Sequence, residues 1–148
     1  MNALYPGKFF KEVATGDVFA SRMTVTETHI VTAAGLFGDF NPVHVDEVFA
    51  SDSVFEGRVL HGPFTAALMS AAVGMYFAGT AIAYLEHNCR FLAPVRPGDT
   101  LTSEWTVKET LDKPRQGGGI VVMDGRCHNQ RGIIVAKGEG KILIRVKA

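Results

Sequence analysis

The chain has 148 residues, of which 47% are hydrophobic and 20% are charged. This composition is typical of one globular domain and excludes the disordered and collagen-like classes, so we interpret residues 1–148 as a single domain. Fifteen basic residues balance fifteen acidic ones, and no basic block occurs, so nucleic acid is not an expected partner.

The sequence also carries information about where the protein works. Residues 1–13 lack the apolar core and small-residue cleavage site of a secretory signal. The longest apolar region, residues 64–82, contains Thr, Ser and Gly at helical spacing, which indicates a buried core helix rather than a membrane span. Cys89 and Cys127 stand singly and are expected to be buried thiols, with one disulfide as the alternative. We therefore expect a soluble, cytoplasmic protein without a membrane partner.

The first predicted elements are a strand and a helix. After a lead-in that contains turn signals, β-forming residues over 18–25 predict a strand. Thr26 is suited to cap a helix over residues 27–37, and Gly38 is suited to end it. The residues expected to share the inner face of this helix are Ile30, Ala33, Ala34 and Phe37.

The stretch over residues 37–50 carries a carboxylate, Asp39, and an imidazole, His44, five residues apart. The Asn-Pro pair at 41–42 disfavours a continuous helix or strand, so the backbone should bend and let both side chains point the same way. Histidine titrates near neutrality, which makes an Asp and a His on a rigid loop a candidate acid/base pair. The alternative is that Asp39 and Asp46 cap helices and that His44 is a structural loop residue.

A short helix is expected next, capped by Asp46 and running to about Ser51. Val48 and Phe49 should turn inward from this helix. Residues 53–59 then form a linking loop before the long apolar segment.

The apolar segment over residues 64–78 follows Pro63, which suits the first turn of a helix because its missing N–H is not needed there. The segment contains no charge, so the helix must be covered, most simply by a curved sheet. The residues that recur at helical spacing are Phe64, Ala67, Leu68, Ala71, Ala72 and Met75.

Four β-rich runs supply that sheet. Pro97 and Gly98 predict a type II turn between the first two runs, and Leu101, Ser103, Trp105 and Val107 alternate with polar residues in the second, as in a half-buried antiparallel strand. The expected fold class is therefore α+β, with an antiparallel sheet wrapped around a central apolar helix. The runs are at about 81–93, 99–110, 119–130 and 132–146.

Three motifs follow one another along nearly the whole chain. The first, Gly-Asp-x-Asn-Pro-aliphatic-His with a small residue downstream, is formed by Gly38, Asp39, Asn41, Pro42, Val43, His44 and Ala50. The second is formed by Leu60, His61 and Gly62, and the third by Phe91, Pro94, Val95, Pro97, Gly98, Asp99 and Thr100. In this order they resemble the MaoC-like dehydratase family, specifically its (R)-specific enoyl-CoA hydratases. Phe37 departs from the pattern, because family members usually carry a small residue there, and its bulk can reshape the pocket beside Asp39.

The resemblance implies a single hot-dog fold and an enzyme, a hydro-lyase that reversibly hydrates trans-2-enoyl thioesters to (R)-3-hydroxyacyl thioesters by syn addition. It implies no metal or other cofactor, a substrate carried on coenzyme A or acyl carrier protein, and a homodimer or higher homo-oligomer. Asp39 and His44 would hold one water, with His44 taking its proton and Asp39 orienting the water or relaying the proton. Asn41 would brace the loop or hydrogen-bond the pair.

The start of the apolar helix is the expected oxyanion hole. Gly62 offers a free backbone N–H at a helix N-terminus, and its lack of a side chain permits close approach, although tight packing alone is the alternative. His61 is expected to support the site by hydrogen bonding rather than to act as an acid. By resemblance, Ser70 and Val73 would face the acyl chain, with core packing as an equal alternative for each.

The remaining polar residues carry weaker signals. Arg58 and Arg90 can in principle meet the phosphates of a carrier, although a solvated arginine is the simpler interpretation. We assign no function to His29, His87 or His128.

Other functions on this fold are an acyl-CoA thioesterase, a metal hydrolase and a non-catalytic module that binds acyl thioesters. Residues 62–82 contain no Asp or Glu, which argues against the common thioesterase arrangement. The spacing of Asp39, His44 and His61, with Asp46, matches no ordinary zinc pattern. The presence of both Asp39 and His44 argues against an inactive module.

Overall fold

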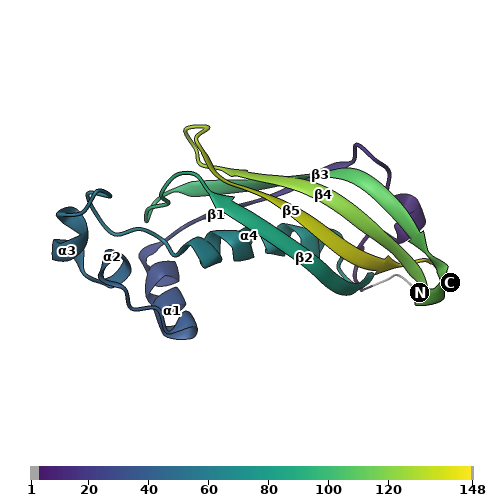
Figure 1. The fold of residues 1–148 in the computed structure, drawn as a ribbon, viewed down its shortest axis with the longest axis horizontal. Helices are drawn as coiled ribbons and strands as arrows, with labels where there is room; N and C mark the ends of the chain where they lie inside the picture. The colour runs from purple at the N-terminus through teal and green to yellow at the C-terminus, as the bar shows by residue number, and fades with distance from the viewer. Residues whose placement is uncertain (1–3, 148) are drawn as a thin grey trace.

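The computed structural model describes residues 4–147. A curved antiparallel sheet of five strands covers one long helix, and three shorter helices gather beyond one end of the sheet (Figure 1). This arrangement confirms the predicted α+β hot-dog fold. The strands are β1 (Val18–Thr24), β2 (Ala81–Phe91), β3 (Thr100–Lys113), β4 (Gly118–His128) and β5 (Ile134–Arg145). The helices are α1 (Glu27–Phe37), α2 (Pro42–Val45), α3 (Glu47–Ser51) and α4 (Gly62–Tyr76), with short 3-10 turns at Phe10–Glu12 and Pro114–Gln116.

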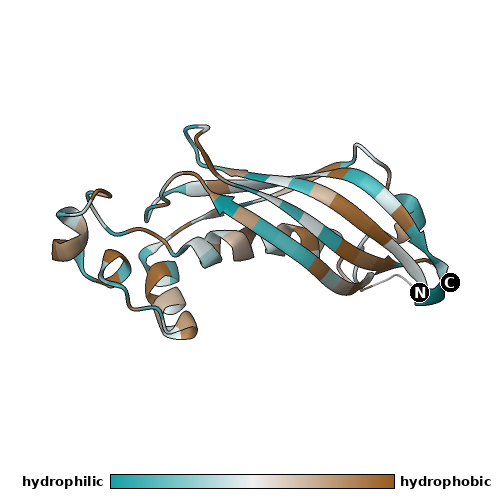
Figure 2. Ribbon diagram, in the orientation of Figure 1, coloured by the Kyte–Doolittle hydropathy of each residue, from teal (hydrophilic) through white to brown (hydrophobic). Residues whose placement is uncertain are grey.

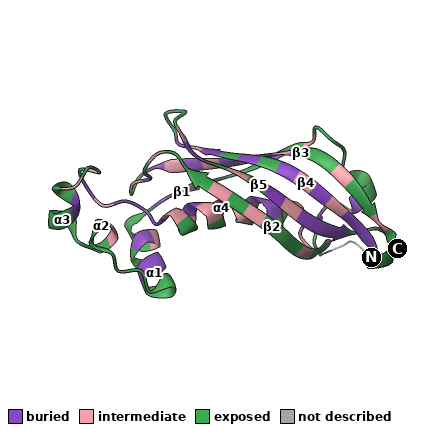
Figure 3. Cartoon of the chain, in the orientation of Figure 1, coloured by how far each residue is buried: buried purple, intermediate pink, exposed green. Residues whose placement is uncertain are grey.

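The sheet has the strand order β1-β3-β4-β5-β2. Along β3 the predicted alternation is confirmed, because Leu101, Ser103, Trp105 and Val107 are buried between less buried neighbours (Figure 3). The indole Nε1–H of Trp105 donates to the Met69 carbonyl of α4 over 2.9 Å, which fixes the sheet on the helix. Gly125 on β4 allows the Trp105 ring to lie close to the β4 backbone, since a Cβ on Gly125 would come within 2.7 Å of the ring.

Helix α4 starts and ends close to the predicted positions, and Pro63 lies in its first turn. Its buried residues are Thr65, Met69, Ala72 and Val73. The expectation that the whole apolar helix is covered is wrong on one side, where Met75 has an exposed fraction of 73%. The sheet covers α4 from one side, so the opposite side, which carries Ala67, Ala71 and Gly74 as well as Met75, stays exposed.

Helices α1, α2 and α3 form what we call the overhang, residues 27–51. Its buried hydrophobic residues are Ile30, Ala33, Ala34 and Ala50. Hydrophobic residues recur along these helices as they do along the strands (Figure 2). The prediction that Val48 and Phe49 turn inward is wrong, since their exposed fractions are 77% and 51%. Within residues 4–147 no layer covers that side of α3, and Phe37 is likewise 46% exposed.

The caps of the overhang explain its path. Gly38 ends α1 with a φ of 72°, and Asp46 accepts a hydrogen bond from the Phe49 N–H over 3.0 Å at the start of α3, as predicted. Helix α2 was not predicted. Asn41 caps it by accepting from the Val43 N–H over 3.3 Å, and Pro42 occupies its first turn, where no N–H is needed.

The two cysteines do not form the disulfide that the sequence left open as an alternative. Cys89 and Cys127 are free cysteines, and burial raises the pKa of both thiols. Among the helices of residues 4–147, none is both long and apolar enough to pass through a bilayer.

Candidate active site

The structure brings Asp39 and His44 together. Asp39 lies just beyond the end of α1, where its Oδ1 accepts the Asn41 N–H over 3.1 Å. His44 lies on α2, and its Nε2 is 3.7 Å from Oδ2 of Asp39. The imidazole is 12% exposed and the carboxylate 49% exposed, so the pair lies at the protein surface with the histidine on the inner side.

The hydrogen bonds of His44 fix its tautomer. Its Nδ1 is 2.7 Å from the Val59 carbonyl oxygen, which can only accept, so Nδ1 carries the proton. In the neutral imidazole, Nε2 then presents a lone pair toward a second acceptor, the Asp39 carboxylate. A separation of 3.7 Å is too long for a direct hydrogen bond, but it suits a bridging water that donates one O–H to each group.

His61 touches both members of the pair. Its Nε2–H donates to the Asp39 carbonyl over 2.9 Å, and its ring stacks on His44 with centroids 3.7 Å apart. Phe37 packs edge-on against the same ring, with centroids 5.8 Å apart. His61 is only 1% exposed, and its Nδ1 has no hydrogen-bond partner within residues 4–147. The sequence predicted that His61 supports the site, but it gave no signal that His61 stacks on His44. This contact depends on how α2 lies against the start of α4.

Gly62 opens α4 next to His61. Pro63 has no N–H, and the N–H groups of Phe64 and Thr65 donate to the His61 carbonyl over 3.0 and 3.4 Å. The Gly62 N–H has no partner among the described residues, so it is the donor of this turn that remains free. A Cβ on Gly62 would lie 2.9 Å from the Phe91 ring, which shows how closely the strand approaches the helix start.

A cavity of about 440 Å³ opens beside these groups. His44 and Gly62 both line it, whereas Asp39 and His61 lie outside the set of lining residues. The remaining wall is largely apolar, which suits a hydrocarbon chain next to a polar reacting group. Its apolar residues include Val43, Phe55, Leu60, Phe91, Val95 and Val135.

Several residues singled out in the sequence lie elsewhere. Ser70 and Val73 are not among the residues that line the cavity, and Val73 is 1% exposed in the core. Arg58 is held by two carboxylates, those of Glu27 and Glu47, and these hydrogen bonds raise the pKa of its guanidinium. Arg90 is exposed on β2.

The number of free ligand atoms shows whether this site could hold a metal ion. Asp39, His44 and His61 each offer an atom, and these atoms lie within 4.8 Å of one another. Two of the four imidazole nitrogens are protonated and donate to carbonyls, and Nδ1 of His61 is buried from solvent. Only Asp39 and Nε2 of His44 remain, which is fewer than the three protein ligands of a catalytic zinc site.

The chain is similar in sequence and in fold to known proteins over most of its length. The MaoC like domain family matches residues 10–123. The (R)-specific enoyl-CoA hydratase of Rhodospirillum rubrum is 32% identical over 136 residues, which cover 92% of this chain and 91% of that protein. The 3-hydroxybutyryl-CoA dehydratase of Methylorubrum extorquens is 31% identical over 127 residues, covering 80% and 81%. The unliganded R-hydratase PhaJ1 from Pseudomonas aeruginosa superposes with a TM-score of 0.83 at 34% identity, covering 93% of this chain and 86% of that chain.

Proposed function

The chain belongs to the MaoC-like dehydratase family, and we propose that it catalyses the reversible syn hydration of trans-2-enoyl thioesters to (R)-3-hydroxyacyl thioesters. The observation that carries the proposal is the 3.7 Å gap between Nε2 of His44 and Oδ2 of Asp39, beside an apolar cavity that both His44 and Gly62 line. The site combines a water-binding acid/base pair, a free backbone donor and a space for an acyl chain.

The pair supplies the water and the protons. A water that donates to both acceptors presents its own lone pairs toward the cavity, where Cβ of the enoyl group is the electrophile. His44 accepts one proton as the C–O bond forms, and Asp39 orients the water or relays the proton. The pair then returns this proton to Cα from the side on which the water entered, so addition is syn. The two groups act as one coupled unit.

Gly62 stabilises the charge that develops on the thioester oxygen. As water adds to Cβ, electron density moves to the carbonyl, and a backbone N–H at a helix N-terminus is suited to bind the resulting enolate. An oxyanion-hole donor contributes on the order of 3 kcal/mol to transition-state stabilisation. Phe91 and Leu60 form the apolar surroundings that keep this interaction strong.

A Gly62→Ala substitution should lower kcat/KM for crotonyl-CoA by about tenfold or more, because the added Cβ would lie 2.9 Å from the Phe91 ring and would displace the cavity wall next to the free N–H. Steady-state kinetics measures the effect. Gly35→Ala is the matched control, since Gly35 lies on α1 at an exposed position where an added Cβ would meet no atom within 4 Å. Unchanged kinetics in Gly62→Ala would remove the helix start from the catalytic site.

The reaction as proposed uses no metal or other cofactor, and the acyl group is carried on coenzyme A or acyl carrier protein. Two free ligand atoms are too few for a catalytic metal site. We expect full hydratase activity after exhaustive treatment with EDTA, measured as the loss of enoyl absorbance. Loss of activity that added metal restores would contradict this expectation.

The acyl group is proposed to occupy the cavity beside Gly62, rather than a path along Ser70 and Val73. This placement follows from the lining residues, which come from α2, the 53–60 segment, α4, the end of β2 with the following residues 92–95, and the start of β5. A panel of crotonyl, octenoyl and branched enoyl thioesters would measure which chains the cavity accepts.

Thioester cleavage is the alternative reaction, and product analysis separates it from hydration. Helix α4 contains no Asp or Glu that could activate water at the thioester carbon. We expect crotonyl-CoA to lose its enoyl absorbance without release of free thiol. Appearance of thiol in proportion to substrate consumed would instead assign the chain as a thioesterase.

The proposed location of the protein is the cytoplasm.

The proposed assembly is a homodimer that forms through β2 and α4. Within the described part of the chain, β2 pairs with β5 alone, which leaves an unpaired edge of eleven residues. Ile82 and Leu85 on this strand are 44% and 50% exposed, and Met75 on α4 is 73% exposed. A second copy related by a twofold axis would cover these surfaces with itself.

Met75→Lys should therefore shift the protein from dimer to monomer, because it buries an unpaired charge in the proposed interface. Sedimentation velocity measures the change. Leu36→Lys is the control, since Leu36 on α1 is 75% exposed and lies outside the proposed interface. A dimer that persists in Met75→Lys at low protein concentration would exclude the α4 face.

A further inference from the structure

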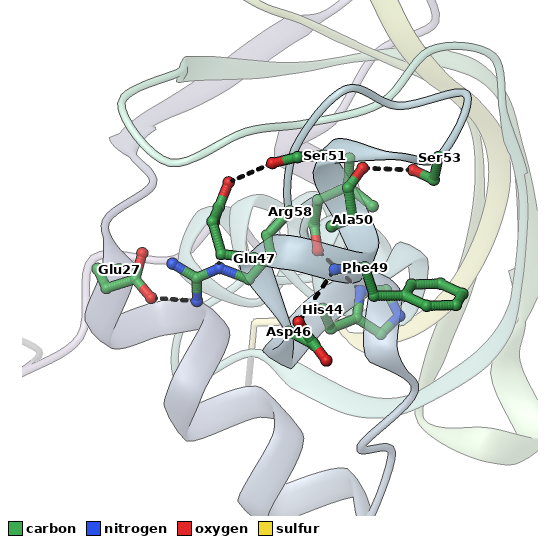
Figure 4. Close-up of polar contacts among 10 residues, drawn as sticks. Glu27, His44, Asp46, Glu47, Phe49, Ala50, Ser51, Ser53 and Arg58 are labelled. Carbon is green, nitrogen blue, oxygen red and sulfur yellow. Dashed lines mark hydrogen bonds and ion pairs between the residues drawn. The ribbon is translucent and has the colours of Figure 1, made fainter.

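We propose that Arg58 is a positioning residue, which sets the separation of Asp39 and His44 by joining α1 and α3 to the segment that holds His44. The inference rests on the proposed hydratase function, because it concerns how that acid/base pair is held. Figure 4 shows the Arg58 side chain between Glu27 and Glu47.

The contacts of Arg58 form a fork. Its Nη1 is 2.5 Å from Oε1 of Glu27, and its Nε is 2.7 Å from Oε2 of Glu47. The Arg58 side chain is 20% exposed, whereas those of its two partners are 52% and 61% exposed. The planar guanidinium binds two carboxylates in fixed directions and so restrains both α1 and α3. A lysine ammonium group, which is a point charge, would restrain them less.

Each partner of Arg58 leads along the chain to a member of the acid/base pair. Glu27 lies in the first turn of α1, and the other end of that helix passes through Gly38 to Asp39. Glu47 is the first residue of α3, which directly follows the helix that carries His44. Arg58 thus links the supports of both catalytic side chains.

Arg58 also adjoins the residue that binds His44 directly. The Val59 carbonyl accepts the Nδ1–H of His44 over 2.7 Å, and the Val59 N–H donates to the Val43 carbonyl over 3.1 Å. A shift of the Arg58 backbone therefore moves the acceptor that fixes both the tautomer and the direction of the imidazole.

The overhang depends on such polar links because its apolar packing is sparse. Its buried hydrophobic residues are one isoleucine and three alanines, Ile30, Ala33, Ala34 and Ala50. Its large apolar side chains are mostly exposed, including Val48 and Leu36 at 77% and 75%. Without a dense core, loss of the Arg58 fork would let α1 and α3 shift relative to α2. A misplacement of about 1 Å can cost a rate factor of about a hundred.

The test compares Arg58→Met with Arg126→Met. Arg126 on β4 also forms a two-point pair, with Glu104, but is outside the residues that line the cavity. We expect Arg58→Met to lower kcat for crotonyl-CoA by about tenfold or more, with KM within about twofold of wild type. Arg58→Lys should recover only part of the loss, and Arg126→Met should retain the wild-type kcat.

A phosphate-binding role for Arg58 predicts a different pattern. Crotonyl-N-acetylcysteamine lacks the phosphates of coenzyme A, so a positioning residue affects kcat equally with both substrates. If Arg58→Met raises KM for crotonyl-CoA alone and leaves kcat unchanged, the positioning proposal is overturned. Addition of Glu27→Gln and Glu47→Gln to Arg58→Met should cause little further loss, because the three residues act as one unit.

A measurement independent of activity separates this inference from the proposed function. The Nδ1–H of His44, bonded to Val59, should exchange with solvent about tenfold faster or more in Arg58→Met than in wild type, as observed by NMR of ¹⁵N-labelled histidine. Arg126→Met should leave the exchange rate unchanged. Equal exchange in all three proteins would overturn the positioning proposal, whereas a wild-type protein without hydratase activity would overturn the proposed function alone.

Discussion

His44→Ala should lower the rate of crotonyl-CoA hydration by at least about a hundredfold while the protein stays folded. The substitution removes Nε2, the acceptor that faces Asp39 across 3.7 Å and that takes the proton of the attacking water. It also removes a ring that packs on His61. His44 lies on the short helix α2 and outside the hydrophobic core, so circular dichroism and thermal unfolding should show a folded variant.

His128→Ala is the matched control for this experiment. The Nδ1 of His128 also lies near a backbone carbonyl, that of Asn129 at 3.2 Å, but the residue is at the end of β4 and does not line the cavity. Its activity should equal that of the wild type. A His44→Ala protein with full hydratase activity would remove His44 from the mechanism.

Asp39→Asn should likewise reduce hydration by at least about a hundredfold. Asparagine keeps the shape of the side chain and an oxygen that can accept the Asn41 N–H, so the turn after α1 is preserved. It loses the negative charge and the second acceptor that hold the water against His44. The loss should appear in kcat, because the carboxylate acts on the reacting water rather than on the carrier.

Asp46→Asn controls for the loss of a carboxylate in the same segment. Asparagine is as good an N-cap as aspartate, so the hydrogen bond from the Phe49 N–H at the start of α3 is retained. We expect wild-type activity from Asp46→Asn. Equal losses in Asp39→Asn and Asp46→Asn would indicate a general effect of charge rather than a role for Asp39.

The sequence predicted the central pair because local rules decide that region. Gly38 ends α1 and the Asn-Pro pair prevents the helix from continuing, so the chain turns and brings Asp39 beside His44. Helix α2 itself was missed, since its four residues are too short for a periodic pattern, although Asn41 followed by Pro42 is a recognisable start signal.

The wrong predictions concern residues whose burial and contacts depend on segments that are distant in the sequence. Val48 and Phe49 were predicted to be buried because they are apolar, but burial requires a covering layer that residues 4–147 do not provide. The prediction that the whole apolar helix is covered was wrong for the same reason, because the sheet covers only one side of α4 and leaves Met75 exposed. The stacking of His61 on His44 and the fork of Arg58 depend on residues 11 to 31 positions apart, which no helical or strand period links.

The most direct test of the account is hydration of crotonyl-CoA in D₂O, with NMR assignment of the product at C2 and C3. If one Asp39–His44 pair delivers both the water and the proton from the same face, the product is (R)-3-hydroxybutyryl-CoA with a single deuterium at C2, syn to the new hydroxyl. An anti product or a mixture at C2 would contradict the shared acid/base pair, and an (S) product would contradict the proposed (R) specificity.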